Sequence, residues 1–188
     1  MIQRFETRQE MVDALVQPGQ VLCEIGVFMG EFARHLVSLD PKLLVCIDPF
    51  DGWNCSGDQD GNNVKNAYLP VIFDHMCATF AKEFSVKIER GRSQDVLPQY
   101  PDEYFDFMYI DGDHSYEGVK RDLLLCAKKI KRGGIIAGHD YMVNKAKCQH
   151  NYNFGVQRAV SEFCEECGWE IVALAFDGCI SFALKKID

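Results

Sequence analysis

Short apolar runs alternate with amphipathic segments along most of this chain. An apolar run of roughly four to eight residues is typical of a β-strand covered on both faces, whereas apolar residues three and four positions apart are typical of a helix. Buried strands are predicted at residues 21–25, 43–47 and 135–137, and strands are also predicted at 86–89, where apolar and polar residues alternate, and at 105–110. Helices are predicted at residues 30–39, 64–84 (with a break near Pro70), 115–130 and 156–167. Two further strands, 170–176 and 179–184, are joined at Asp177-Gly178, a pair that favours an antiparallel hairpin.

This order of elements predicts an α/β fold. Strand–helix–strand units join parallel neighbours through right-handed crossovers, and the helices then cover both faces of the sheet. We therefore expect a Rossmann-like, doubly wound, mostly parallel sheet of seven strands with a C-terminal antiparallel hairpin. The whole chain, residues 1–188, is expected to form a single domain in which residues 1–19 are an N-terminal helical segment.

Composition narrows the classes of function. Acidic residues outnumber basic ones by 28 to 20, and this gives the 188-residue chain a net charge of −8, which argues against a protein that works mainly by binding nucleic-acid phosphates. The cationic stretch 128–132 is explained by a helix C-terminus, where the helix dipole favours positive charge. No apolar run approaches the roughly 18 residues of a membrane span. Residues 1–10 do not resemble a signal peptide. We expect a cytoplasmic protein that binds neither nucleic acid nor membrane, and we leave homo-oligomer formation open.

A glycine-containing turn follows the first predicted buried strand. Gly26 allows a sharp turn and the close approach of a ligand to the backbone, and Gly30 lets the next helix begin close to the sheet. Glu24 and Met29 stand where the dinucleotide fingerprint G-x-G-x-x-G has glycines, and a carboxylate repels a pyrophosphate but attracts an amine or a hydroxyl. Asp48 ends the next strand, where an acid can accept hydrogen bonds from a ribose.

Acidic and imidazole side chains follow two predicted strands that are neighbours in the sheet. They are Asp111, Asp113, His114, His139 and Asp140. Adjacent parallel strands lie about 4.8 Å apart, so the two groups can face a single pocket. Such a pocket offers either a site for a hard cation such as Mg²⁺ or a general base. Capping of the following helix is the alternative role for Asp113 and for its neighbour Ser115.

Two polar loops, 50–63 and 141–154, are expected to be active-site loops, because long loops in compact domains are usually functional or mobile. They carry the aromatic residues Trp53, Tyr141, Tyr152 and Phe154. We expect these side chains to close over a bound acceptor.

The glycine turn and the segment Ile47-Asp48-Pro49 resemble the first two motifs of the class I S-adenosylmethionine-dependent methyltransferases. The resemblance extends over about residues 20–186 and implies a set of cofactor-binding residues: Glu24, Gly26, Gly30, Asp48, Ser93 and Asp111. In this set Gly26 would lie against the methionine part of the cofactor, Asp48 would hold the ribose, and Ser93 would border the adenine. Glu24 would support the turn or face the amino group of the cofactor.

Residues 109–122 and 133–141 resemble, more narrowly, the branch that includes macrocin-type and novobiocin-type sugar O-methyltransferases. Members of that branch bind Mg²⁺ through an acid after the fourth strand and an acidic pair after the fifth. The resemblance implies metal roles for Asp111, Asp140 and His139, which stands where the first acid of the pair would be. The base in relatives lies just after the first metal ligand, so Asp113 and His114 are alternative catalytic bases.

Together these patterns predict an S-adenosylmethionine-dependent methyltransferase that methylates a hydroxyl of a small-molecule acceptor, with Mg²⁺ as a candidate second cofactor. A nucleotide-dependent oxidoreductase is the first alternative, and Glu24 and Met29 disfavour it. A cofactor-binding module without catalysis is the second.

Overall fold

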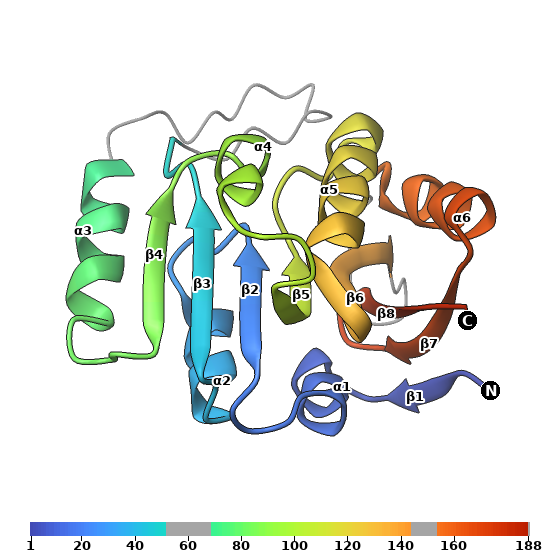
Figure 1. Ribbon diagram of the computed structural model, residues 1–188, viewed down its shortest axis with the longest axis horizontal. Coiled ribbons are helices and arrows are strands. Elements are labelled where there is room, and N and C mark those ends of the chain that lie inside the picture. Colours follow the sequence, from blue (N-terminus) through green and yellow to red (C-terminus); the bar gives the residue numbers. More distant parts are fainter. Residues whose placement is uncertain (52–68, 144–153, 188) are drawn as a thin grey trace.

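The computed structural model describes residues 1–51, 69–143 and 154–187. Over these residues eight strands form one sheet in the order β1-β7-β8-β6-β5-β2-β3-β4 (Figure 1). The strands are β1 (Gln3–Phe5), β2 (Val21–Ile25), β3 (Leu43–Asp48), β4 (Val86–Arg90), β5 (Phe105–Ile110), β6 (Ile130–Val143), β7 (Trp169–Ala175) and β8 (Cys179–Lys186). The helices are α1 (Arg8–Leu15), α2 (Glu31–Ser38), α3 (Leu69–Thr79), α4 (Ser93–Val96), the short 3-10 helix η1 (Leu97–Gln99), α5 (Tyr116–Lys129) and α6 (Val156–Cys167).

The direction of the strands confirms the predicted mostly parallel sheet with a C-terminal hairpin. β8 runs antiparallel to both of its neighbours, β6 and β7, and the other five pairings are parallel. The strand count differs from the prediction of seven. The additional strand is β1, which pairs in parallel with β7 through residues such as Phe5 and Ala175. The three residues of β1 are mostly exposed and have no apolar pattern that would predict a strand. This segment is a strand because it pairs with β7.

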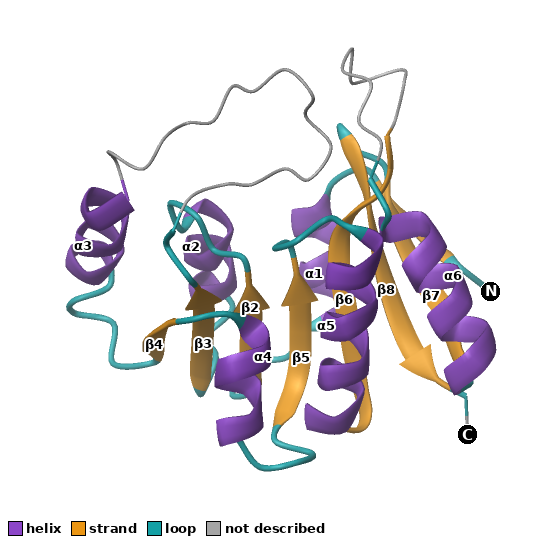
Figure 2. Ribbon diagram, turned by 90° about the horizontal axis from the view of Figure 1, so that it is seen from above, coloured by secondary structure: helices purple, strands orange, loops and turns teal. Residues whose placement is uncertain are grey.

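Helices cover both faces of the sheet (Figure 2). The helices α1, α2 and α3 lie on one face, and α4, α5 and α6 lie on the other. Each face has its own apolar cluster: Met11, Phe32 and Met76 belong to the first, and Leu123 and Phe163 belong to the second. The sheet is therefore buried on both sides, as a continuous apolar strand such as β2 requires.

The ends of β2, β3, β5 and β6 share one edge of the sheet, which we call the carboxyl edge. β7 runs in the same direction, since it is antiparallel to β8, which is antiparallel to β6. β1 is parallel to β7 and also ends at this edge, where the amide of Phe176 donates to the carbonyl of Phe5 at 2.9 Å. Arg8 at the start of α1 therefore lies at the carboxyl edge, although the expected helical segment 1–19 gave no reason to place it there.

Two element boundaries depart from the predicted pattern. The helix predicted at 115–130 is α5 and ends at Lys129, but the strand predicted at 135–137 begins earlier, because residues 131–134 form an irregularity within β6, in which the register with β5 shifts after Ile130 and Gly133 has φ of +74°. The helix predicted over 64–84 is α3, with Pro70 in its first turn, where a missing N–H is tolerated. Residues 64–68 lie outside the described residues.

The cationic stretch 128–132 is paired with acidic residues just before β5 and at its start. Lys129 Nζ lies 2.7 Å from Asp102 Oδ1, and Lys131 Nζ lies 2.8 Å from Asp106 Oδ1. Arg132 extends into solvent, with Nε 3.5 Å from Glu103 Oε1. Three of these cations are thus opposed by carboxylates rather than gathered into an unpaired basic surface. Among the described residues, no helix has the length and apolar character of a membrane span.

Candidate functional site

The glycine turn connects β2 to α2 at the carboxyl edge. Gly26 has φ of +84°, and a Cβ at this position would lie 2.2 Å from the backbone oxygen of Asp111. Here the backbones of β2 and β5 approach closely, because the Asp111 amide donates to the carbonyl of Ile25 at 2.7 Å. Gly30 is the N-cap of α2, and its Cβ would lie 2.5 Å from the sulfur of Met76 on α3. The neighbouring backbone therefore requires a glycine at position 26, whereas at position 30 the positive φ of +75° favours glycine.

Asp48 holds the glycine turn in place from the end of β3. Its Oδ2 accepts hydrogen bonds from the amides of Val27 and Phe28 at 2.9 and 3.0 Å, and its Oδ1 accepts one from the amide of Phe50 at 2.7 Å. A carboxylate offers about four acceptor positions. Asp48 therefore keeps about one position for a ligand hydroxyl beside the turn.

Glu24 lies inside the sheet layer, with 1% of its surface exposed. Its Oε2 has no hydrogen-bond partner among the described residues. Burial raises the pKa of Glu24 well above its ordinary value, and the nearby carboxylate of Asp111 adds to this, while Arg8 acts in the opposite direction. Burial thus shifts the ionisation of this side chain toward the neutral carboxylic acid.

Ser93 directs its hydroxyl into the protein. The hydroxyl donates to the carboxylate of Asp122 on α5, and both side chains are buried. Burial raises the pKa of Asp122 to about 6, although this hydrogen bond and Arg121 oppose the shift. A contact between Ser93 and a ligand would therefore involve its backbone rather than its hydroxyl.

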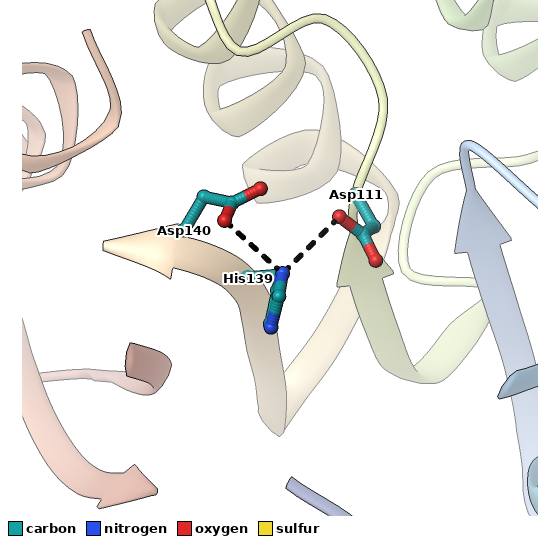
Figure 3. Close-up of side chains that lie close together, drawn as sticks. All are labelled: Asp111, His139 and Asp140. Carbon is teal, nitrogen blue, oxygen red and sulfur yellow. Dashed lines mark ion pairs between the residues drawn. The ribbon is translucent and has the colours of Figure 1, made fainter. Parts of the chain in front are cut away.

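Asp111, which directly follows β5, lies close to His139 and Asp140, which follow the last residue of β6 that pairs with β5, Gly138 (Figure 3). His139 Nδ1 lies 3.7 Å from Asp111 Oδ1 and 3.3 Å from Asp140 Oδ1. The sequence-based expectation that residues after these two strands face one another is met by these three side chains. Burial acts to lower the pKa of His139, but the two carboxylates outweigh it and raise the pKa.

His114 belongs to the same cluster. Its Nε2 lies 2.7 Å from Asp140 Oδ2 and 3.4 Å from Asp111 Oδ1, and its ring packs against Phe154 with centroids 4.8 Å apart. Burial acts to lower the pKa of His114, but the hydrogen bonds with Asp111 and Asp140 outweigh it and raise the pKa to about 9.

Asp140 reaches His114 because the backbone of β6 is distorted at this point. Asp140 has φ of +58°, a left-handed conformation that is uncommon for a residue with a side chain. The register between β6 and β8 shifts between Gly138 and Met142, on either side of it. Burial acts to raise the pKa of Asp140, but hydrogen bonds from His114 and His139 lower it far below the ordinary value.

Asp113 lines a small cavity together with His114 and His139, but its contacts are made with the start of α5. It is exposed, its Oδ1 accepts from the amide of Ser115 at 2.9 Å, and its Oδ2 lies 3.7 Å from Arg121 Nη2. Ser115 is the N-cap of α5, and its hydroxyl oxygen accepts from the amide of Gly118 at 3.1 Å. Both residues thus make the contacts expected for the start of a helix.

Arg8 is a member of the cluster that the sequence analysis missed. Its Nη1 donates to Asp111 Oδ2 at 3.1 Å, and its guanidinium carbon lies 4.6 Å from the centre of the Phe32 ring. Its backbone amide donates to Asp177 Oδ2 at 3.1 Å, in the turn between β7 and β8. No motif contains Arg8, and 103 positions separate it from Asp111, so local spacing carried no signal of this contact.

Three residues of the cluster bring possible metal ligands together. The donor atoms of Asp111, His139 and Asp140 lie within 4.8 Å of one another. However, Mg²⁺ prefers oxygen ligands and one of the three donors is an imidazole. Both carboxylates are moreover paired with protein cations, Asp111 with Arg8 and Asp140 with His114. This donor set does not suit Mg²⁺.

The aromatic residues expected to close over an acceptor are described only in part. Trp53 and Tyr152, with most of both predicted loops, lie outside the described residues. Tyr141 is half-buried, and its ring lies 5.9 Å from that of Phe182. Phe154 packs on His114, so it borders the cluster.

Comparison with known proteins relates the chain to one family. Residues 23–141, more than half of the chain, match the model of a family described as a methyltransferase domain. Uncharacterized protein R132 of Acanthamoeba polyphaga mimivirus is 28% identical over 138 residues, which are 73% of this chain and 58% of that protein. The chain thus spans less than two thirds of the length of this curated relative.

Solved structures share the fold at low sequence identity. A Clostridium thermocellum protein proposed to be an rRNA methylase superposes with a TM-score of 0.66 at 14% identity, over 96% of this chain and 93% of that chain. An O-methyltransferase from Bacillus cereus in complex with SAH superposes with a TM-score of 0.64 at 17% identity, over 95% of this chain and 78% of that chain. At this level of identity the similarity concerns the fold.

Proposed function

This chain belongs to the methyltransferase-domain family, and on that premise we propose that it transfers a methyl group from S-adenosylmethionine to a hydroxyl of a small acceptor. The observation that supports this most is the placement of two features side by side at the carboxyl edge. One is the glycine turn that Asp48 holds, and the other is the cluster around Asp111 and His114. Open α/β sheets bind their ligands at this edge.

S-adenosylmethionine supplies a methyl group on a positively charged sulfur. The turn residues fit its nucleoside, since Asp48 keeps an acceptor position for a ribose hydroxyl. Glu24 keeps one buried carboxyl oxygen without a partner among the described residues, close to the same turn. We propose that Gly26 and Gly30 shape this turn and that the backbone at Ser93 borders the adenine.

His114 is the described residue best placed to accept the proton of the acceptor hydroxyl. Asp140 pairs with Nε2 of the His114 ring. Once the imidazolium has lost a proton from Nδ1 to solvent, Nδ1 is the nitrogen that can accept the proton of the acceptor. Asp113 is instead directed to the first turn of α5. Asp140 then orients the imidazole, as a carboxylate does in many hydrolases.

Substitution of the two candidate bases distinguishes them. His114→Gln is expected to lower kcat by about 10²-fold or more, because a general base contributes about 10²–10⁴-fold. Asp113→Asn is the matched control and is expected to change kcat by less than about threefold, since a helix-start contact does not enter the chemical step. Cofactor affinity, measured by calorimetry for both variants, checks that the site is intact. A larger loss in Asp113→Asn than in His114→Gln would reverse the assignment.

Charge favours a small acceptor over nucleic acid. The chain carries a net charge of −8, and its cationic stretch is opposed by Asp102, Glu103 and Asp106. The resemblance of residues 109–122 and 133–141 to sugar O-methyltransferases favours a sugar or a similarly hydroxylated metabolite within this class.

Magnesium assistance is tested by chelation. Arg8 and His114 already oppose the carboxylates of Asp111 and Asp140, so we expect turnover to persist in excess EDTA. The measurement is the rate of S-adenosylhomocysteine release with EDTA, with and without added Mg²⁺. Loss of turnover in EDTA and recovery with Mg²⁺ would show that the cluster rearranges to hold the ion.

Calorimetric titration with S-adenosylmethionine, S-adenosylhomocysteine and NAD tests the proposed function. Saturable binding of both sulfur nucleosides, without binding of NAD, is the expected result. Binding of NAD alone would favour the oxidoreductase. Release of S-adenosylhomocysteine with members of a library of hydroxylated metabolites would then identify the acceptor, whereas a non-catalytic module would bind the cofactor and release no product with any of them.

A further inference from the structure

Arg8 and Asp111 form a pair of opposite charges at the carboxyl edge, beside the glycine turn. The two groups are 3.1 Å apart, and their side chains keep about a fifth of their surface exposed, 23% and 20% respectively. The backbone of Asp111 contacts the turn directly, because Gly26 lies against it. A charge pair that is partly open to solvent is therefore located where the glycine turn would receive a ligand.

The position of Arg8 is determined by three separate elements besides its own helix. Asp177, between β7 and β8, binds its backbone amide, Phe32 on α2 supports the face of its guanidinium, and Asp111 at the end of β5 binds one edge. A guanidinium has five N–H donors, so the contacts with Asp111 and with the hydroxyl of Tyr109 leave others for a further partner. Arg8 is thus a preorganised cation rather than a flexible surface side chain.

From this geometry we propose that Arg8 and Asp111 together bind the amino-acid head group of the cofactor, with Arg8 holding the α-carboxylate and Asp111 holding the α-ammonium. This inference rests on the proposed use of S-adenosylmethionine. The head group is a zwitterion whose two charges are separated by about the length of an ion pair. It can open the Arg8–Asp111 pair and restore both charge–charge contacts, so that binding leaves no charge unpaired in a half-buried site. Arg8 can offer the carboxylate a bidentate contact, which gives direction as well as attraction.

Two ligands that differ only in the head group test the assignment. S-adenosylhomocysteine has the complete amino-acid group, and 5′-methylthioadenosine lacks it but keeps the nucleoside and the sulfur. Arg8→Met is expected to weaken the binding of S-adenosylhomocysteine by about 10- to 100-fold, as the loss of a charged hydrogen bond does, and to leave the binding of 5′-methylthioadenosine unchanged. Arg8→Lys keeps the charge without the bidentate geometry and is expected to lie between the wild type and Arg8→Met.

A decarboxylated analogue of S-adenosylhomocysteine tests the pairing of Arg8 with the carboxylate, because it removes the group from the ligand instead of from the protein. It is expected to bind the wild type as weakly as S-adenosylhomocysteine binds Arg8→Met, and the Arg8→Met substitution should then have no further effect on it. Arg132→Met is the matched control, because Arg132 is 94% exposed and lies at the edge of the sheet opposite the carboxyl edge. This variant is expected to bind all three ligands as the wild type does.

The outcomes separate this inference from the proposed function. Equal affinity of the wild type and Arg8→Met for S-adenosylhomocysteine would overturn the role of Arg8 while the proposed function stands. If Arg8→Met lost affinity for S-adenosylhomocysteine and for 5′-methylthioadenosine to the same extent, Arg8 would be needed for folding, and its proposed role in binding would be overturned. Failure of the wild type to bind either sulfur nucleoside would reject the proposed function, and the inference with it.

Discussion

Asp122 is a carboxylic acid held inside the protein, and its ionisation opposes folding. It lies on α5 with 2% of its surface exposed and accepts the hydroxyl hydrogen of Ser93. Its pKa of about 6 exceeds the value of about 3.9 expected in the unfolded chain. An acid whose pKa is raised on folding contributes full stability below the unfolded pKa. This contribution is lost as the pH rises through the folded pKa, here between about pH 4 and pH 6.

Asp122→Asn is therefore expected to stabilise the protein at neutral pH. Asparagine keeps an oxygen that can accept from Ser93 and has no proton to lose. The two pKa values differ by about two units, which corresponds to about 3 kcal/mol in the free energy of unfolding above pH 7 and to little difference near pH 4. Urea denaturation of both proteins at the two pH values measures this. A variant that is less stable than the wild type at pH 7.5 would contradict it.

At the level of residues, the sequence predicted the chemistry of the carboxyl edge better than the contacts made there. Asp111, His139 and Asp140 could be placed together because they follow the predicted strands 105–110 and 135–137, whose apolar patterns are clear. Arg8 could not, since its contact with Asp111 depends on β1 pairing with β7. The cofactor roles of Glu24, Asp48 and Ser93 stay predictions.

Among the elements, the contact between β2 and β5 depends on a single missing side chain. Gly26 and Gly19 both have positive φ, +84° and +78°, so alanine is strained at either position. At Gly19 a Cβ would meet nothing within 4 Å, whereas at Gly26 it would meet the backbone of Asp111 at 2.2 Å. The pair of positions therefore separates backbone strain from overlap with the neighbouring strand.

Gly19→Ala is expected to lower the free energy of unfolding by about 1–2 kcal/mol, the cost of a left-handed conformation. Gly26→Ala should cost at least about 2 kcal/mol more, because two paired strands must separate to admit the methyl group. Chemical denaturation of the two variants, with circular dichroism as the signal, measures the difference. Equal losses would show that the β2–β5 contact adjusts freely.

Elements with their own apolar pattern were predicted closely, and those defined by tertiary contacts were not. The strand 105–110 and the helix 156–167 have the bounds that their apolar spacing indicates. The four-residue helix α4 is too short for helical periodicity to reveal it. The strand predicted at 135–137 begins at Ile130 as β6, because residues 131–134 belong to the register shift against β5, and that shift depends on the partner strand.

For the whole molecule, a ligand at the carboxyl edge is expected to stabilise the fold, because it would contact segments that are far apart in the chain. The proposed site draws on α1, the glycine turn, β3 and the ends of β5 and β6. A ligand that binds only the folded state at 100 times its Kd stabilises by about 2.7 kcal/mol. S-adenosylhomocysteine should therefore raise Tm in a concentration-dependent way, and adenosine at equal concentration should raise it less. An unchanged Tm at saturating S-adenosylhomocysteine would contradict the proposed site.

The strand β1 also makes the two ends of the molecule unequal for immobilisation. Only two residues separate β1 from Arg8, so force or bulk applied at the N-terminus is transmitted to the charge pair with Asp111. The last strand ends at the opposite edge, where Lys186 pairs with Trp169 at the start of β7. An affinity tag, a surface anchor or a fluorescent reporter is therefore best attached at the C-terminus, where it leaves the carboxyl edge undisturbed.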